Sequence, residues 1–359
     1  MRKFISLGFV LSLCIGCGSS STGPGTSGGT GGMGGQNAGT GGSNGGGTGG
    51  AATGGSSGSG SGGTTLPDGG ATGGAMGGTD AGAETGGGTV ACGTAQPDIT
   101  GIAGAEGLVI GPDGTIYFSQ GGSQSVGRLR PGAGMMPEKT WAKLPAGATT
   151  VWGVAYDRAA KVLYAGSPTT KTVYKITLED TPTVTPLITM TGSPNGFTMG
   201  PDGALYYSDQ TGGFVDRVAS GSMTKTMINT MLFLSPNGVG FGPDGALYVL
   251  QYAAGSIVKV TVTNGMEQMR TTFVMKGLGN ADGISFDKDG NLYIGFGMGL
   301  SKVSADGQTI THLMGAGNSA NVEFGAGALS CKDIYFVNGG KLMRYTNDTE
   351  GAVVPWHVP

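Results

Sequence analysis

One phrase recurs along this chain at nearly even intervals, and it constrains the fold more than any other feature. Its six copies begin at Gly107, Gly153, Gly196, Gly238, Gly283 and Asn321. Successive copies lie 46, 43, 42, 45 and 38 residues apart. A period of about 40 to 50 residues is typical of a propeller blade built from four strands. The chain is therefore predicted to be all-β, with a six-bladed β-propeller over residues 92–359.

Each full copy predicts a β-hairpin. A short apolar segment is followed by Asp-Gly and then by a second segment centred on Leu-Tyr or Ile-Tyr, as in residues 106–120. Asp-Gly between apolar segments is a strong hairpin signal, because glycine accepts a positive φ. Five tyrosines share one repeat position and are expected to pack between blades: Tyr117, Tyr206, Tyr248, Tyr293 and Tyr335.

The sixth copy is one strand short. Two segments compete to supply the missing strand, residues 98–102 before the first copy and residues 352–358 at the C-terminus. We favour residues 98–102, because their spacing to Glu106 matches that between outer and next inner strands elsewhere in the chain. Pairing between the chain ends would then close the ring and protect its edges.

Residues 1–16 have the features of a secretion signal. Arg2 and Lys3 precede an apolar run over residues 4–13, which is too short to span a bilayer. The sequence around Cys17 resembles the lipobox of bacterial lipoproteins, which implies a lipidated Cys17 and an outer-membrane lipoprotein on the periplasmic side or the cell surface. A cleaved signal without lipid is the alternative.

Residues 17–91 form the lipidated cysteine and a linker of Gly, Ser, Thr and Ala, which lacks the apolar side chains needed to offset the entropy of ordering. We expect this linker to be disordered. The net charge of -3 and pI near 5.4 argue against a nucleic-acid partner. Membrane attachment is expected through the lipid alone, and a monomer is expected.

Two cysteines remain once Cys14 and Cys17 are assigned to the signal and the lipid. Cys92 opens the folded region, and Cys331 lies in the last copy. In an oxidising compartment we expect a disulfide between them, worth about 5 kcal/mol in the chain-entropy model. Two unconnected thiols are the alternative.

The residue that precedes each inner strand of a propeller points into the mouth of the central channel. In the first five copies this residue is Glu106, Trp152, Asn195, Asn237 and Asp282. Two carboxylates and two amides around one axis favour Ca²⁺ or Mg²⁺ over a softer metal. Asn195 and Asn237 also fit an ordinary Pro-Asn-Gly turn, which is the alternative explanation for these two amides.

Residues 95–359 resemble the six-bladed gluconolactonase/regucalcin family through Glu106-Gly107, the Pro-Asn-Gly segments at 194–196 and 236–238, Asp282-Gly283 and the closing phrase 321–325. The resemblance implies a divalent-metal site formed by Glu106, Asn195, Asn237 and Asp282. It implies that Asp282 doubles as the catalytic base or nucleophile and that Asn195 binds metal or substrate. Trp152 at the mouth is a candidate substrate-binding residue.

Two classes of function follow. The first is a metal-dependent hydrolase of lactones or related esters, and the second is a non-catalytic propeller of the NHL-repeat kind that binds a polymer or protein of the cell envelope. The residues after Glu106 depart from the usual Pro and aromatic residue of the family, which leaves the substrate open. A lyase resembling virginiamycin B lyase is less well supported, since that family has seven blades and a catalytic histidine.

Overall fold

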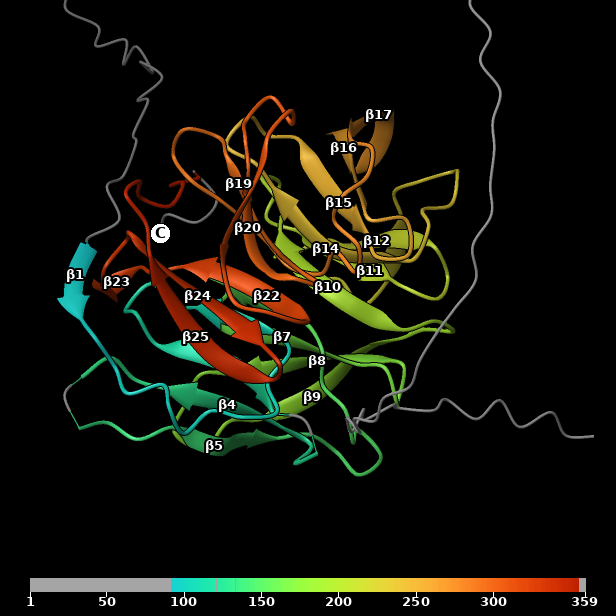
Figure 1. Ribbon diagram of the computed structural model, residues 1–359. Coiled ribbons are helices and arrows are strands. Elements are labelled where there is room, and N and C mark those ends of the chain that lie inside the picture. Colours follow the sequence, from blue (N-terminus) through green and yellow to red (C-terminus); the bar gives the residue numbers. More distant parts are fainter. Residues whose placement is uncertain (1–91, 121, 133, 355–359) are drawn as a thin grey trace, which may run out of the picture. The chain divides into compact units, whose positions relative to one another are not determined.

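The computed structural model describes residues 92–120, 122–132 and 134–354. Those residues form strands, turns and short connections, with no helix among them. Six antiparallel sheets are arranged around one axis, which makes the fold a six-bladed β-propeller, as predicted (Figure 1). The signal, Cys17 and the linker lie outside the described residues.

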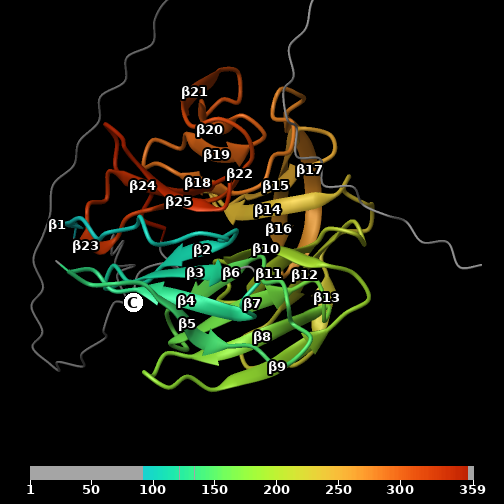
Figure 2. The same ribbon diagram turned by 60° about the horizontal axis from the view of Figure 1, so that its bottom comes forward.

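Five blades have four strands each, and the order of the strands in every sheet follows the order in the sequence. Blades I and II contain β2 (Leu108–Ile110), β3 (Ile116–Gln120), β4 (Ser125–Leu129), β5 (Glu138–Lys143), β6 (Val154–Asp157), β7 (Val162–Ser167), β8 (Thr172–Thr177) and β9 (Val184–Thr189). Blades III to V contain β10 (Pro194–Met199), β11 (Leu205–Asp209), β12 (Phe214–Val218), β13 (Lys225–Met227), β14 (Pro236–Phe241), β15 (Leu247–Gln251), β16 (Ser256–Thr263), β17 (Met266–Val274), β18 (Ile284–Phe286), β19 (Leu292–Phe296), β20 (Gly299–Val303) and β21 (Ile310–Met314). Figure 2 shows β6 to β9 stepping outwards in sequence order.

The Asp-Gly hairpins form where the sequence predicts them. Gly203 and Gly245 have φ angles of 68° and 74°, a region in which a Cβ atom would be strained. The preceding aspartate closes each turn, since Asp202 accepts a hydrogen bond from the Ala204 N–H and Asp244 accepts one from the Ala246 N–H. These turns connect the first and second strands of blades III and IV.

The core lies between neighbouring blades. The repeat tyrosine of one blade packs against an aromatic side chain on the inner strand of the next, with ring centroids 5.0 Å apart for Tyr206 and Phe241 and 5.0 Å apart for Tyr293 and Phe324. The Tyr206 hydroxyl also donates a hydrogen bond to Asp202 at 3.0 Å. The tyrosines therefore have the packing role that was predicted for them.

Blade VI contains three paired strands, β22 (Ser319–Phe324), β24 (Asp333–Asn338) and β25 (Lys341–Thr346). The prediction that residues 98–102 add a regular fourth strand is wrong. Asp98 folds this segment into a turn by accepting hydrogen bonds from the Thr100 N–H and hydroxyl. Only Ala103 bridges to Lys341 on the edge of β25.

The described part of the C-terminal segment, residues 352–354, does not supply the missing strand either. Gly351 bridges to Asp287, and the Ala352 N–H donates to Phe286 O at 2.9 Å, so this segment contacts the end of β18 in blade V. Residues 355–359 lie outside the described residues.

The start of the described chain is instead joined to the last blade by a two-stranded sheet and a disulfide. β1 (Cys92–Ala95) pairs in parallel with β23 (Gly327–Leu329), and the expected disulfide links Cys92 to Cys331 with their Cα atoms 5.4 Å apart. Figure 1 shows β1 and β23 side by side at the edge of the ring. In the part of the chain that the structure describes, no helix could cross a membrane.

Candidate metal centre at the channel mouth

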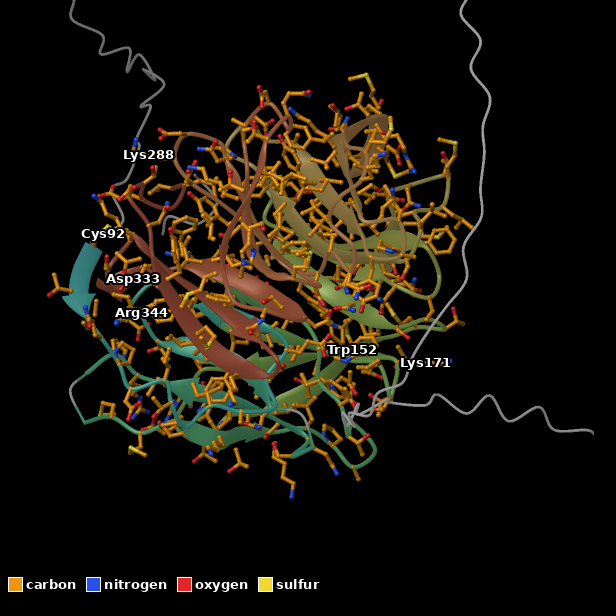
Figure 3. All side chains as sticks on the ribbon, in the orientation of Figure 1. Cys92, Trp152, Lys171, Lys288, Asp333 and Arg344 are labelled. Atoms are coloured by element: carbon orange, nitrogen blue, oxygen red, sulfur yellow. A yellow bond between two sulfur atoms is a disulfide. The ribbon has the colours of Figure 1, made fainter. Side chains whose placement is uncertain are left out.

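The five predicted side chains meet at one cavity. Glu106, Trp152, Asn195, Asn237 and Asp282 all line a central cavity of about 100 Å³. Each precedes or begins the inner strand of a different blade, and we call these five the ring residues. Trp152 lies towards the middle of the propeller, whereas Cys92 lies at its edge (Figure 3).

The turn explanation for the two amides is wrong. Asn195 lies within β10 and Asn237 within β14, and neither residue has a positive φ. Both strands carry a register shift at this point, between Pro194 and Phe197 in β10 and at the corresponding place in β14. Such β-bulges re-aim side chains next to functional sites. The Pro-Asn-Gly segments therefore serve the channel mouth.

The glycine after each ring residue is required by the neighbouring blade. A Cβ atom on Gly153 would overlap the carbonyl oxygen of Asn195, and one on Gly238 would overlap the carbonyl oxygen of Asp282. Neither glycine has a positive φ, so close approach of two backbones explains their identity. The inner strands pack too tightly at this level to admit a side chain.

Blade VI departs from this pattern. Asn321 occupies the glycine position, and its amide Nδ2 donates to Leu108 O at 2.6 Å, which turns the side chain towards the backbone of blade I. The Asn321 N–H donates to Glu106 O at 3.3 Å. The preceding residue, Ala320, has no ligating atom on its side chain. Asn321 thus contributes to closure of the ring, and Ala320 adds no fifth oxygen-bearing side chain to the ring residues.

The two carboxyl groups of the ring act on each other. Burial raises the pKa of Glu106 well above its usual range, and the negative charge of Asp282 raises it further. Burial raises the pKa of Asp282 to about 7, against the opposing effect of a hydrogen bond from the Asn237 side chain. Two half-buried carboxylates that share one cavity are poorly compensated without a cation, so the pair favours retaining a proton near neutral pH.

The two amides line the same cavity. Asn237 is 2% exposed, and its Oδ1 atom has no hydrogen-bond partner among the described residues. The Asn195 Nδ2 donates to Gln210 Oε1 at 3.1 Å, which leaves the Asn195 oxygen available. A buried carboxamide oxygen without a partner carries a desolvation cost that a bound cation would remove. The donor set of two carboxylates and two amides fits Ca²⁺ or Mg²⁺.

Metal ligation itself remains a prediction. In the described part of the chain, no three His, Cys, Asp or Glu side chains form a ligating group. The ring reaches four oxygen-bearing side chains only when Asn195 and Asn237 are included. The described histidine, His312, lies on the exposed outer strand β21.

Two serines position the ring backbone, and sequence reasoning missed them. The Ser119 hydroxyl accepts hydrogen bonds from the N–H groups of Glu106 and Gly107 at 3.0 and 2.8 Å. The Ser208 hydroxyl accepts from the Gly196 N–H and donates to Asn237 O at 2.7 Å, which links blades III and IV. Both serines follow the repeat tyrosine by two residues, so their shared position was a signal in the sequence.

A second polar layer, also missed, lies along the same cavity. Arg158 and Glu323 both line it, in blades II and VI. Burial raises the pKa of Glu323 to about 8, although the positive charge of Arg158 opposes this shift. Burial lowers the pKa of Arg158, and Glu323 opposes that change. The channel therefore contains a carboxylic acid and a guanidinium in addition to the ring residues.

The six blades place the protein among the six-bladed β-propellers. A gluconolactonase from Xanthomonas campestris has a similar structure, with a TM-score of 0.56 and 20% identity, covering 70% of this chain and 86% of that one. A regucalcin from Agrobacterium tumefaciens, described as a calcium-binding protein, has a TM-score of 0.58 and 16% identity, covering 74% and 99%. Virginiamycin B lyase from Staphylococcus aureus has a TM-score of 0.50 and 15% identity, covering 68% and 85%.

These identities are low enough that the likeness shows the fold alone. No family model matches the chain, and no curated protein matches its sequence.

Proposed function

We propose that this protein is an exported, lipid-anchored hydrolase of lactones or related esters that depends on a divalent cation. One observation carries the proposal: Glu106 and Asp282 share a buried cavity with the unpartnered Oδ1 of Asn237. The similar folds of a gluconolactonase and a calcium-binding regucalcin support it. The leader sequence supports export and attachment through Cys17.

Each ring residue has a distinct role in this proposal. Glu106, Asn195, Asn237 and Asp282 would hold Ca²⁺ or Mg²⁺, which would polarise the substrate carbonyl. Ca²⁺ takes roughly six to eight oxygen ligands, so these side chains leave positions for water and a substrate oxygen. Trp152 would contact the substrate at the mouth.

The chain also provides a proton acceptor. In the metal-free chain the pKa of Asp282 is raised to about 7, and a bound cation would lower it, so the carboxylate would be ionised and able to accept a proton near neutral pH. We therefore assign Asp282 the role of accepting a proton from the attacking water. Asn237, hydrogen bonded to Asp282, would orient its carboxylate.

A lactone panel with and without chelator tests the proposal. We expect lactone hydrolysis that chelator abolishes and that Ca²⁺ or Mg²⁺ restores, with loss of about 100-fold or more in kcat/KM for Asp282→Asn. Asp348→Asn, an exposed change on blade VI, is the control and should leave activity unchanged. Hydrolysis that persists in chelator and in Asp282→Asn would contradict the assignment. Absence of hydrolysis with every lactone would favour the binding-module alternative.

A further inference from the structure

Large apolar side chains are exposed in three connections at the same end of the propeller as the channel mouth. They are Met231, Leu232, Leu234, Met275 and Met298, which are 61, 62, 61, 77 and 65% exposed, and we call them the apolar rim. Three of the five lie in the connection from β13 to β14. The other two lie in the β17–β18 and β19–β20 connections.

The rim is at the same end of the propeller as the ring residues. The β13–β14 connection leads directly into Asn237, and the β17–β18 connection leads into Asp282. The Leu234 N–H donates to Gln251 Oε1 at 2.7 Å, at the end of β15. The Gly297 N–H donates to Gly279 O at 2.9 Å, which joins the connection carrying Met298 to the one carrying Met275.

Hydrogen bonds fix the backbone of the β13–β14 connection, which carries three of the rim residues. Met231 O accepts hydrogen bonds from Asn229 Nδ2 at 2.8 Å and from Arg270 at 2.9 Å. Phe233, in the same connection, is buried, and the Arg270 guanidinium lies 4.1 Å from its ring centroid. The neighbouring Met231, Leu232 and Leu234 are consequently exposed, at the end of the propeller where the ring residues lie.

The composition of the three connections favours an uncharged, apolar occupant. Residues 228–235, 275–281 and 297–298 contain one charged side chain, Lys276. A polyhydroxylated substrate would need several hydrogen-bonding side chains, whereas thioether and isobutyl groups bind aliphatic chains. Methionine also adapts its shape to different apolar partners. Large exposed apolar patches commonly mark binding surfaces.

We propose that the apolar rim binds the aliphatic chain of an amphiphilic lactone or ester while the carbonyl end of that substrate reaches the ring residues. The inference rests on the proposed hydrolase function and names its substrate class. It distinguishes this protein from a hydrolase of sugar lactones, whose substrates have no aliphatic chain for the rim to cover.

The test uses full-length protein and a series of lactones with alkyl chains of increasing length. Burial of a methylene group favours binding by roughly twofold to fourfold, so kcat/KM should rise by about that factor per methylene until the rim is covered. Met231→Ser and Leu234→Ser should flatten this dependence and lower kcat/KM for the longest chains by about tenfold. Met136→Ser, an equally exposed methionine in the β4–β5 connection at the other end of the propeller, should leave the series unchanged.

Hydrolysis that is independent of chain length, or a series unaffected by Met231→Ser and Leu234→Ser, would overturn the inference while leaving the proposed hydrolase intact. If no lactone is hydrolysed, calorimetric titration with alkyl lactams of the same lengths separates the two proposals. Chain-length-dependent binding that Met231→Ser weakens would support the apolar site without the hydrolase, and its absence would refute the site. Vesicles of phosphatidylethanolamine and phosphatidylglycerol test a membrane surface as the alternative occupant. If wild type binds them, Met231→Ser and Leu234→Ser do not, and the lactone series is unchanged, the rim binds a membrane and the inference is overturned.

Discussion

Replacing Asp282 by asparagine should stabilise the metal-free protein above neutral pH, and Ca²⁺ should offset most of that gain by stabilising wild type more than the variant. Raising a carboxyl pKa from 3.8 to about 7 costs the fold about 4 kcal/mol at a pH above both values. Below about pH 4 the carboxyl is protonated in the folded and unfolded chains alike, so it contributes nothing. Between about pH 4 and 7 the unfolded chain releases its proton first, and stability falls as pH rises.

Urea unfolding at a series of pH values, in chelator and in millimolar Ca²⁺, measures this effect. In chelator, wild type should lose stability from pH 4 to 7, and Asp282→Asn should lose less and be more stable by up to about 4 kcal/mol at pH 8. Glu106 remains in the variant, and burial alone still raises its pKa, so some slope should persist.

Ca²⁺ should offset most of this difference. At about 100 times its dissociation constant, a ligand adds roughly 2.7 kcal/mol to the stability of the protein that binds it, and the variant should gain less. Asp348→Asn is the control and should follow wild type under both conditions. Equal pH profiles for wild type and Asp282→Asn in chelator would refute the idea that this carboxyl is buried at a cost to the fold.

Three further changes test other parts of the structure. Gly238→Ala places a Cβ atom over the Asp282 carbonyl and should lower the free energy of unfolding by about 3 kcal/mol, whereas Gly279→Ala, which meets open space, should change it by less than about 1 kcal/mol in the same urea titration. Joint replacement of Cys92 and Cys331 by serine should cost up to about 5 kcal/mol, and a melting temperature that reductant does not lower in wild type would contradict this. Glu323→Gln should make unfolding less pH-dependent between about pH 5 and 8 and raise stability above pH 8, because the pKa of Glu323 is raised to about 8, and unchanged urea midpoints at pH 9 would refute it.

The blades could be predicted from sequence because their determinants are local. Asp-Gly turns and alternating apolar residues act within about fifteen residues, so the hairpins around Gly203 and Gly245 form where expected. Closure of the ring was predicted less well. It depends on contacts between residues more than two hundred positions apart, as in β1 with β23, and on the turn made by the Asp98 side chain.

The ring residues could be predicted because they share one repeat position, and all five line the cavity. The role of Gln210 could not be predicted, because its hydrogen bond with Asn195 depends on how two connections meet in space. Glu323 could have been predicted from its repeat position. Two positions after the repeat glycine, the other blades have Val109, Ala155, Thr198, Gly240 and Ser285, and Glu323 is the single charged residue in that series.

The glycines that follow the ring residues separate what can change in this protein from what cannot. Replacement of Gly153 or Gly238 by any residue with a Cβ atom would push two backbones apart, so substitutions at these positions should destabilise the fold. The residue one step earlier lines the cavity at the axis, and its carbonyl oxygen approaches the glycine of the preceding blade. In the first five blades, new chemistry could therefore arise at this mouth by single substitutions of the ring residues that leave the backbone packing between blades unchanged.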